Sequence, residues 1–228
     1  MKKIVIVNPK GGSGKTTLAT NLASHFARAG GHPTLMDYDP QGSSMHWLAN
    51  RADTYPSIHG IAAYEKPMGM TRSFQLKVPD ECQWLIVDSP AGFTSAEIRD
   101  ITRDADKVVM PVLPSTFDIH AASRTVADLL LISKISRADA QLGVVANRTR
   151  RNNRAFQRLI RFLDSLGIPV VAVLRDTQNY VHASEFGIGL SDLKSWQIVK
   201  DKPEWERLID FVSGGQANQA LAAQHDLA

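Results

Sequence analysis

Short apolar runs alternate with longer segments of helical character along most of the chain. Nearly every position in each run is hydrophobic, which is typical of strands buried on both faces of a parallel sheet. The predicted strands are Lys3–Val7, Pro33–Met36, Gln83–Val87, Lys107–Leu113, Leu142–Ala146 and Val170–Leu174. The predicted helices are Thr16–Ala29, Ser43–Ala49, Phe117–Ser133, Asn153–Leu166 and a last helix that begins with Pro203–Val212. This alternation predicts an α/β fold with a doubly wound, mainly parallel sheet and helices on both faces.

The 228 residues are enough for one domain of this class with a large buried core. The stretch Arg51–Asp80 interrupts the alternation with three prolines, two glycines and few apolar clusters. Prolines and glycines at this density indicate irregular backbone. We therefore expect a single domain over residues 1–228, with an irregular excursion at this stretch.

Charge and cysteine content limit the possible partners and the cellular compartment of this protein. Lysine plus arginine number 26 against 23 for aspartate plus glutamate, a net charge of +3 that permits an anionic partner without demanding one. Cys82 is the only cysteine, which excludes an intramolecular disulfide and a cysteine-ligated cluster within one chain. The start, Met1–Val7, does not read as a signal peptide, and no apolar run approaches the roughly 20 residues that span a bilayer. We expect a cytoplasmic protein.

The segment from Lys10 to Thr17 reads Lys-Gly-Gly-Ser-Gly-Lys-Thr-Thr and joins the first strand to the first helix. Glycines there let backbone N–H groups surround phosphate oxygens, and the helix N-terminus favours an anion. Lys15 would neutralise the β and γ phosphates, and the Thr16 hydroxyl would ligate Mg²⁺. The spacing departs from G-x-x-x-x-G-K-[ST], because the first glycine is Gly11. The alternative is a glycine-rich turn that binds nothing, and the strand–loop–helix context argues against it.

This octapeptide resembles the deviant Walker A motif of the ParA/MinD family of P-loop ATPases. The segment 35–43, Leu-Met-Asp-Tyr-Asp-Pro-Gln-Gly-Ser, is similar to the family's switch I, and 84–92 is similar to its Walker B and switch II. Segments 111–121 and 146–148 also fit, and the likeness is weakest in 51–80 and after 192. Residues 1–113 would then carry the phosphate loop, switch I and Walker B, and 114–228 the base pocket and outer surface.

The resemblance implies an ATP-sandwich dimer with roles for particular residues. Lys10 would reach the partner's nucleotide like an arginine finger supplied in trans, and Gly12 would allow the close approach. The implied ATP-binding loop is Lys10, Gly11, Gly12, Ser13, Gly14, Lys15, Thr16 and Thr17. Asn147 would contact adenine, with Arg148 beside it and Asp176 as a weaker candidate. An ordinary strand-end turn is the alternative for Asn147 and Arg148.

Three acids end or follow predicted strands. Asp88 ends an apolar run, where a carboxylate can hold the Mg²⁺ shell; a helix N-cap is its alternative role. Asp37 would help around Mg²⁺ or brace switch I, and a purely structural strand-end acid is the alternative. By the resemblance, Asp39 would orient the attacking water. Phosphoryl transfer needs this positioning and charge neutralisation more than covalent help.

Six arginines and no acid lie between Arg148 and Leu163. At about 100° per residue, Arg151, Arg154, Arg158 and Arg161 share one helix face. The apolar residues Phe156, Leu159, Ile160, Leu163 and Leu166 lie roughly opposite. A solvated helix face is the alternative, but such faces normally mix charge signs. A stripe of one sign suits phosphates, so the predicted DNA-binding residues are Arg150, Arg151, Arg154, Arg158 and Arg161. A weaker basic cluster, Lys194, Lys200 and Lys202, lies beside Trp196.

The implied function is a ParA-type positioning ATPase that uses ATP and Mg²⁺. It would dimerise on ATP, bind nucleoid DNA without sequence preference, and position a plasmid, a chromosome or a protein body such as a carboxysome. A cargo-adaptor protein would stimulate hydrolysis. The alternatives are a MinD-like membrane-associated regulator of the division site and an ATP-dependent synthase of the dethiobiotin or cobyrinate type. Against the first, residues 216–228 contain no Lys or Arg, so we expect no membrane partner. Lys10 argues against the second.

Near the end of the chain, the last helix is expected to pack in the core through Trp205, Leu208, Ile209 and Val212. Tyr180 and Phe186 are candidates for a partner or dimer surface, although core packing is the preferred interpretation.

Overall fold

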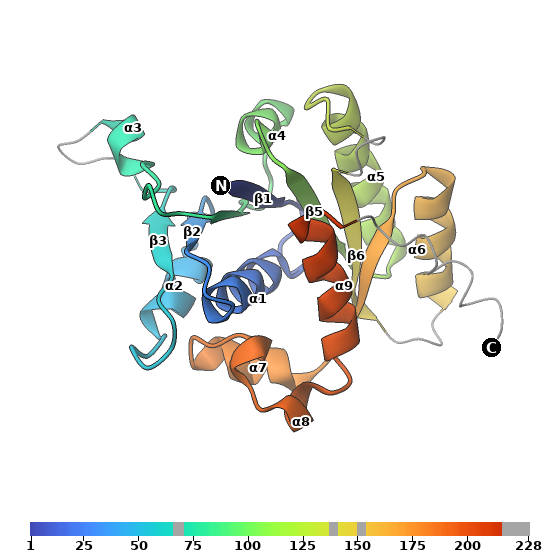
Figure 1. Ribbon diagram of the computed structural model, residues 1–228. Helices are drawn as coiled ribbons and strands as arrows, with labels where there is room; N and C mark the ends of the chain where they lie inside the picture. Colours follow the sequence, from blue (N-terminus) through green and yellow to red (C-terminus); the bar gives the residue numbers. More distant parts are fainter. Residues whose placement is uncertain (66–70, 137–140, 150–153, 216–228) are drawn as a thin grey trace.

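The computed structural model describes residues 1–65, 71–136, 141–149 and 154–215 (Figure 1). Its centre is a seven-stranded sheet with the order β3-β2-β4-β1-β5-β6-β7. The pairings among these strands are all parallel, which confirms the doubly wound α/β prediction. The strands are β1 Lys2–Ile6, β2 Pro33–Asp37, β3 His59–Ala62, β4 Trp84–Asp88, β5 Lys107–Val112, β6 Leu142–Thr149 and β7 Val170–Arg175.

Helices cover both faces of the sheet. They are α1 Lys15–Arg28, α2 Ser43–Ala49, α3 Arg72–Gln75, α4 Ser95–Thr102, α5 Thr116–Leu131, α6 Arg154–Ser165, α7 Gln178–Glu185, the 3₁₀ helix η1 Leu190–Asp192, α8 Ser195–Ile198 and α9 Lys202–Ser213. Alternate residues of β1 point to opposite faces. Ile4 and Ile6 share one apolar core with α1 and α9, while Val5 and Val7 share the other with α4, α5 and α6.

The interpretation of Arg51–Asp80 as irregular is wrong for residues 59–62. These residues form the edge strand β3, which pairs with β2 from Thr34↔His59 to Asp37↔Ala62. His59 and Gly60 are exposed, so β3 lacks the continuous apolar run that marks the central strands. The short helix α3 follows and projects from the body of the molecule (Figure 1). The helices α4, α7 and α8 were also not predicted.

The strand order brings the candidate residues together at the carboxyl ends of the central strands. β1 lies between β4 and β5; the chain leaves β1 for β2 on one side and leaves β5 for β6 on the other. Parallel sheets bind ligands beyond the carboxyl ends of their strands at such a reversal. The phosphate loop follows β1, and Asp37 and Asp88 end β2 and β4 at paired positions.

Candidate nucleotide-binding site

The loop between β1 and α1 depends on glycines and on a buried asparagine. Gly12 and Gly14 have φ angles of 72° and 100°, in the left-handed region that favours glycine. A Cβ atom on Gly14 would clash with Nδ2 of Asn147. That Nδ2 donates a hydrogen bond to the Ser13 carbonyl over 2.8 Å, and Asn147 Oδ1 accepts one from Arg148 N over 2.9 Å. Glycine is therefore required at position 14, and Asn147 supports the loop from β6.

The three residues predicted to contact the adenine base lie at the ends of β6 and β7. Asn147 is 5% exposed with both ends of its amide partnered, while Arg148 and Asp176 are exposed at the ends of β6 and β7. A cavity of about 280 Å³ opens beside Thr16 and Thr17, and its further lining includes Ser43, His46, Tyr180 and Ser184. Neither Arg148 nor Asp176 is among the described residues that line it. Their roles at the adenine stay predictions.

Lys15 is the buried cation of the loop. The residue is 6% exposed, and its Nζ donates to the carbonyl oxygen of Lys10 over 3.1 Å. Burial lowers the pKa of the Lys15 amine, while the nearby carboxylates of Asp88 and Asp39 raise it. A cation held against loop carbonyls at a helix N-terminus is placed to receive phosphate oxygens.

Asp88 accepts two hydroxyl hydrogen bonds on one of its oxygens. Its Oδ2 accepts from Thr16 Oγ1 over 2.8 Å and from Ser44 Oγ over 2.6 Å. Its Oδ1 is buried without a hydrogen-bond partner in the described residues. Burial, chiefly, raises the pKa of Asp88 to about 7, against the lowering effect of the two hydroxyls. The neutral form of this carboxyl group is therefore favoured in the absence of a bound cation.

Asp37 and Asp88 are joined by Ser44, a residue that the sequence did not single out. Asp37 Oδ2 accepts a hydrogen bond from Ser44 N over 3.0 Å, and Asp37 Oδ1 accepts one from Asp39 N over 2.9 Å. Burial raises the pKa of Asp37, and these backbone donors lower it. Ser44 is fully buried at the start of α2, and a serine at that place carries no signal of its own in the sequence.

These residues fit a magnesium ion. A buried carboxylate oxygen without a partner and a threonine hydroxyl on the same carboxylate are oxygen donors of the type that Mg²⁺ prefers. Asp88 and Thr16 would hold the ion, with Asp37 behind them through Ser44. When bound, the ion would supply positive charge to the phosphate oxygens.

Asp39 follows β2 and is more exposed than Asp37. Its Oδ1 accepts a hydrogen bond from Gln41 N over 3.0 Å, and the residue is partly exposed. It also raises the pKa of Lys15, so the two side chains are electrostatic neighbours. Its carboxylate is therefore near the loop cation but outside the Asp37–Ser44–Asp88 cluster, and its role in orienting water stays a prediction.

The Lys10 side chain is more exposed than Lys15 and has a different partner. Its Nζ forms an ion pair of 3.1 Å with Asp118 Oδ1, and its side chain remains 37% exposed. Asp118 lies in the first turn of α5, where its backbone N–H donates to the N-cap residue Ser115. Phe117, beside it, is 81% exposed. Asp118 was not among the predicted site residues.

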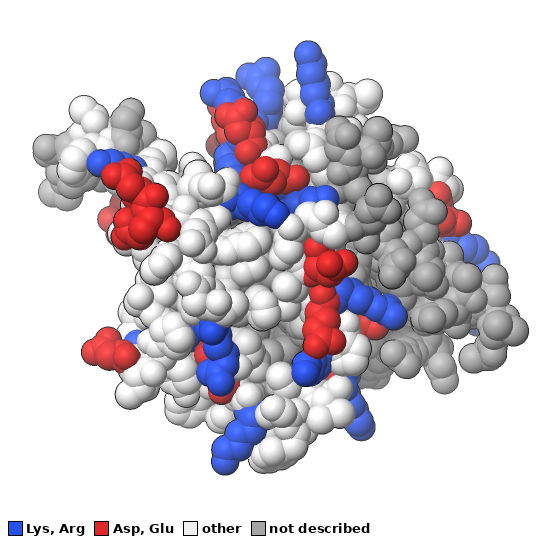
Figure 2. Space-filling model, in the orientation of Figure 1, with Lys and Arg blue, Asp and Glu red and all other residues white. Residues whose placement is uncertain are grey.

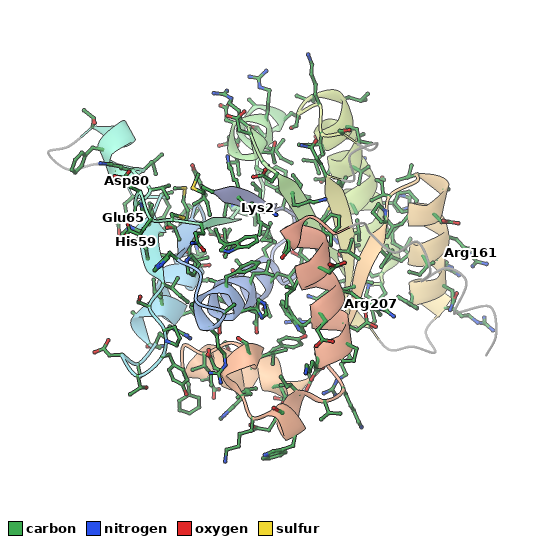
Figure 3. All side chains as sticks on the ribbon, viewed as in Figure 1. Lys2, His59, Glu65, Asp80, Arg161 and Arg207 are labelled. Atoms are coloured by element: carbon green, nitrogen blue, oxygen red, sulfur yellow. The ribbon has the colours of Figure 1, made fainter. Side chains whose placement is uncertain are left out.

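The predicted arginine stripe falls partly within the described residues. Arg154, Arg158 and Arg161 are exposed on α6, and Figure 3 shows Arg161 pointing away from the sheet. The opposite face is buried through Phe156, Leu159 and Leu163, which confirms the predicted orientation of the helix. Arg150 and Arg151 lie outside the described residues.

The remaining predictions concern the C-terminal third. Trp205, Leu208 and Val212 are buried in the core, and Ile209 packs against it, as predicted. Tyr180 packs against the same core, and its hydroxyl accepts a hydrogen bond from Trp205 Nε1 over 2.9 Å. The core interpretation of Phe186 is wrong, because the side chain is 55% exposed at the end of α7. Residues 216–228 lie outside the described part. Within that part, none of the helices combines the length and hydropathy that crossing a bilayer requires.

The raised pKa of Asp88 predicts a pH dependence of stability. In protein free of metal and nucleotide, the folded Asp88 keeps a proton that the unfolded chain releases near its ordinary value of 3.8. The free energy of unfolding should therefore fall as pH rises through this window to about 7, by roughly 4 kcal/mol at most. Asp88→Asn should remove this part of the decline. Urea unfolding with EDTA at several pH values measures it, with Asp176→Asn as the exposed control. Parallel curves for wild type and Asp88→Asn would contradict it.

Comparisons with known proteins identify relatives of this chain. Residues 4–190 match the model of the CobQ/CobB/MinD/ParA nucleotide binding domain. The chain is 25% identical over 194 residues to the maintenance of carboxysome distribution protein A of Halothiobacillus neapolitanus, covering 83% of this chain and 87% of that protein. It is 30% identical over 169 residues to the protein of the same name from Gloeobacter kilaueensis, covering 69% and 76%.

Among solved structures, an aspartate-to-alanine variant of McdA from Cyanothece in complex with ATP superposes with a TM-score of 0.69. It is 18% identical and covers 95% of this chain and 97% of that one, a likeness that shows the shared fold. The family match spans the phosphate loop, both acidic strand ends and the Asn147 support. The ParA/MinD resemblance is thus confirmed, and the chain belongs to the CobQ/CobB/MinD/ParA nucleotide-binding domain family.

Proposed function

We propose that this protein is a ParA-type positioning ATPase whose active form is an ATP-bound dimer. The ParA/MinD proteins of its family are ATPases. The observation that carries the proposal is that the two loop lysines lie in different environments. Lys15 is buried in the loop, while Lys10 is partly exposed and paired with Asp118 on the rim. Because the Lys10 amine is not buried in the phosphate loop of its own protomer, it is available to a triphosphate held by a second protomer.

The hydrolytic roles follow from this arrangement. Lys15 and the glycine loop hold the triphosphate, and Thr16 and Asp88, with Asp37 behind them, hold Mg²⁺. Asp39 orients the attacking water, and the partner's Lys10 neutralises charge as the phosphoryl group transfers. Hydrolysis is then gated by assembly, because the site lacks this cation until two protomers meet. Asn147, Arg148 and Asp176 remain the proposed surroundings of the adenine.

The mass of the protein in solution tests this proposal. With Mg²⁺ and a non-hydrolysable ATP analogue, light scattering should report about twice the mass seen with ADP. Lys15→Ala should stay a monomer under the same conditions, since it cannot hold the triphosphate. A wild-type protein that remains a monomer at saturating analogue would overturn the dimer and the role of Lys10 together.

For the surface of this dimer we propose duplex DNA bound without sequence preference. Support comes from the exposed Arg154, Arg158 and Arg161 of α6, whose one acid, Asp164, lies in the last turn of the helix. Arg150 and Arg151 belong to the same proposed surface. Similarity to the carboxysome distribution proteins favours a protein body as cargo, with a plasmid or chromosome as the alternatives. An adaptor protein would stimulate hydrolysis, and the protein would reside on the nucleoid in the cytoplasm.

Charge reversal tests the DNA surface. Arg154→Glu with Arg158→Glu should weaken the binding of the nucleotide-bound protein to duplex DNA by at least about tenfold at about 100 mM salt, and should flatten the salt dependence. The matched control is Lys194→Glu with Lys200→Glu, which changes the net charge equally at exposed positions of the weaker cluster. Fluorescence anisotropy of a labelled duplex measures both. Equal losses in the two double variants would contradict the assignment to α6.

We also propose that residues 1–228 act as one domain. The sheet supports this, because β5 pairs with β1 on one side and with β6 on the other, so the two parts of the chain share one sheet. A MinD-like membrane regulator and a metabolic synthase remain the alternative functions. A synthase would couple hydrolysis to a small carboxylate substrate, whereas the proposed function predicts a response to DNA.

A further inference from the structure

A second cavity lies away from the phosphate loop, between the C-terminal half of α1 and the segment from η1 to α9. Its volume is about 320 Å³, at the lower end of the range of small-molecule pockets. The apolar part of its lining comes from Ala29, Leu190, Ile198, Trp205 and Ile209. Figure 2 shows the surface between α1 and α9 as largely uncharged, with Lys, Arg, Asp and Glu side chains along its borders.

The charged side chains around the mouth of this cavity carry one more positive charge than negative charge. Lys202 lies 3.6 Å from Glu206, so this exposed pair is close to neutral. Arg28 is 56% exposed, and its Nη1 lies 3.9 Å from Asp192 Oδ1. Asp192 has a closer cation in Arg51, whose Nη1 lies 2.9 Å from Oδ2. Among the described lining residues, Arg28 is thus the cation available to a ligand.

His25, which also lines the cavity, adds polarity without charge. Burial lowers the pKa of its imidazole, so the ring is neutral at pH 7. Its neutral ring can hydrogen-bond to a ligand, whereas the Ser191 hydroxyl donates to Ser24 Oγ, whose own proton goes to Asp192 Oδ2. The cavity therefore combines an apolar floor, a hydrogen-bonding imidazole and an excess of one positive charge, that of Arg28.

Asn21 links this cavity to the nucleotide site. It lines both cavities. Its Nδ2 donates to the Thr17 carbonyl over 2.8 Å, in the first turn of α1, and its Oδ1 accepts from Leu190 N over 2.7 Å. Leu190 forms part of the apolar floor. A ligand that displaces Leu190 would therefore pull on the helix turn that carries the phosphate-binding residues.

We propose that this cavity binds a small amphipathic monoanion, a carboxylate or sulfonate on an aliphatic or aromatic body, and that its occupancy changes nucleotide affinity through Asn21. The body would lie on Leu190, Ile198 and Trp205, and the anionic group would pair with Arg28. A cation of the same shape would meet Arg28 with the same sign of charge and bind poorly.

Octanoate and octylamine are the probes, because they share an aliphatic body and differ in charge. Calorimetry on the 228-residue chain should show octanoate binding at least about tenfold more tightly than octylamine. Arg28→Gln should reduce this preference to about threefold or less, while Arg99→Gln, an exposed arginine on α4, should leave it unchanged. Equal binding of the two probes, or a preference unaltered by Arg28→Gln, would overturn the proposed site.

The link to the nucleotide site has its own test. Saturating octanoate should change the dissociation constant of a fluorescent ATP analogue by at least about threefold, and the analogue should change octanoate affinity by the same factor. Asn21→Ala should lose this mutual effect. Octanoate binding without any effect on the nucleotide would overturn the role of Asn21 and leave the proposed ATPase function untouched.

Discussion

Lys10→Ala is expected to lower ATP hydrolysis by at least about a hundredfold at saturating ATP and Mg²⁺, while ATP binding persists. The binding cation is Lys15, which is buried in the loop, whereas Lys10 reaches Asp118 at the rim with a 37% exposed side chain. A cation supplied in trans acts on the developing charge of the transition state, so its loss falls on turnover. Phosphate release measures hydrolysis, and titration of a fluorescent ATP analogue measures binding.

Asp118→Asn and Lys200→Ala complete this experiment. Asp118→Asn frees Lys10 from its ion pair within the protomer and should leave basal hydrolysis equal to that of wild type or above it. Lys200→Ala removes an exposed lysine far from the loop in sequence and should leave hydrolysis unchanged. Wild-type hydrolysis in Lys10→Ala would disprove the catalytic role of this lysine.

Asp39→Ala is expected to trap the ATP-bound dimer on DNA. Hydrolysis should fall by at least about a hundredfold, because the water loses the carboxylate that orients it. Binding should persist, because the Asp37–Ser44–Asp88 hydrogen bonds do not involve the Asp39 carboxylate. After excess unlabelled DNA is added, the trapped dimer should leave a labelled duplex at least about tenfold more slowly than wild type does with ATP. Asp53→Ala, at an exposed loop position, is the control.

Mixing the two variants decides whether Lys10 acts in trans. In a heterodimer, the Lys10→Ala protomer keeps its own Asp39 and receives Lys10 from the Asp39→Ala protomer. One intact site is thereby restored, so the mixture should hydrolyse ATP at a substantial fraction of the wild-type rate although each variant alone is inactive. If Lys10 acted within its own protomer, the mixture would be as inactive as its parts.

The local sequence pattern was sufficient to predict much of the secondary structure of this molecule. The predicted strands and helices are present with ends shifted by a few residues, because buried parallel strands and amphipathic helices are marked by neighbours in sequence. The phosphate loop, the acidic ends of β2 and β4 and the exposed arginines of α6 were found in the same way. Strand β3 was missed, since an edge strand with exposed residues lacks that pattern.

The sequence by itself thus determined the sheet class, the loop chemistry and which acids stand at strand ends. Only the tertiary structure decided which distant residues meet there. Asp118 pairs with Lys10 and Asn147 lies against Gly14 because β5 and β6 follow β1 in the sheet order. Ser44 joins Asp37 to Asp88 because β2 and β4 are adjacent and in register. Such contacts depend on strand order and register, which arise from packing of the whole chain and leave no mark on the residues next to them in sequence.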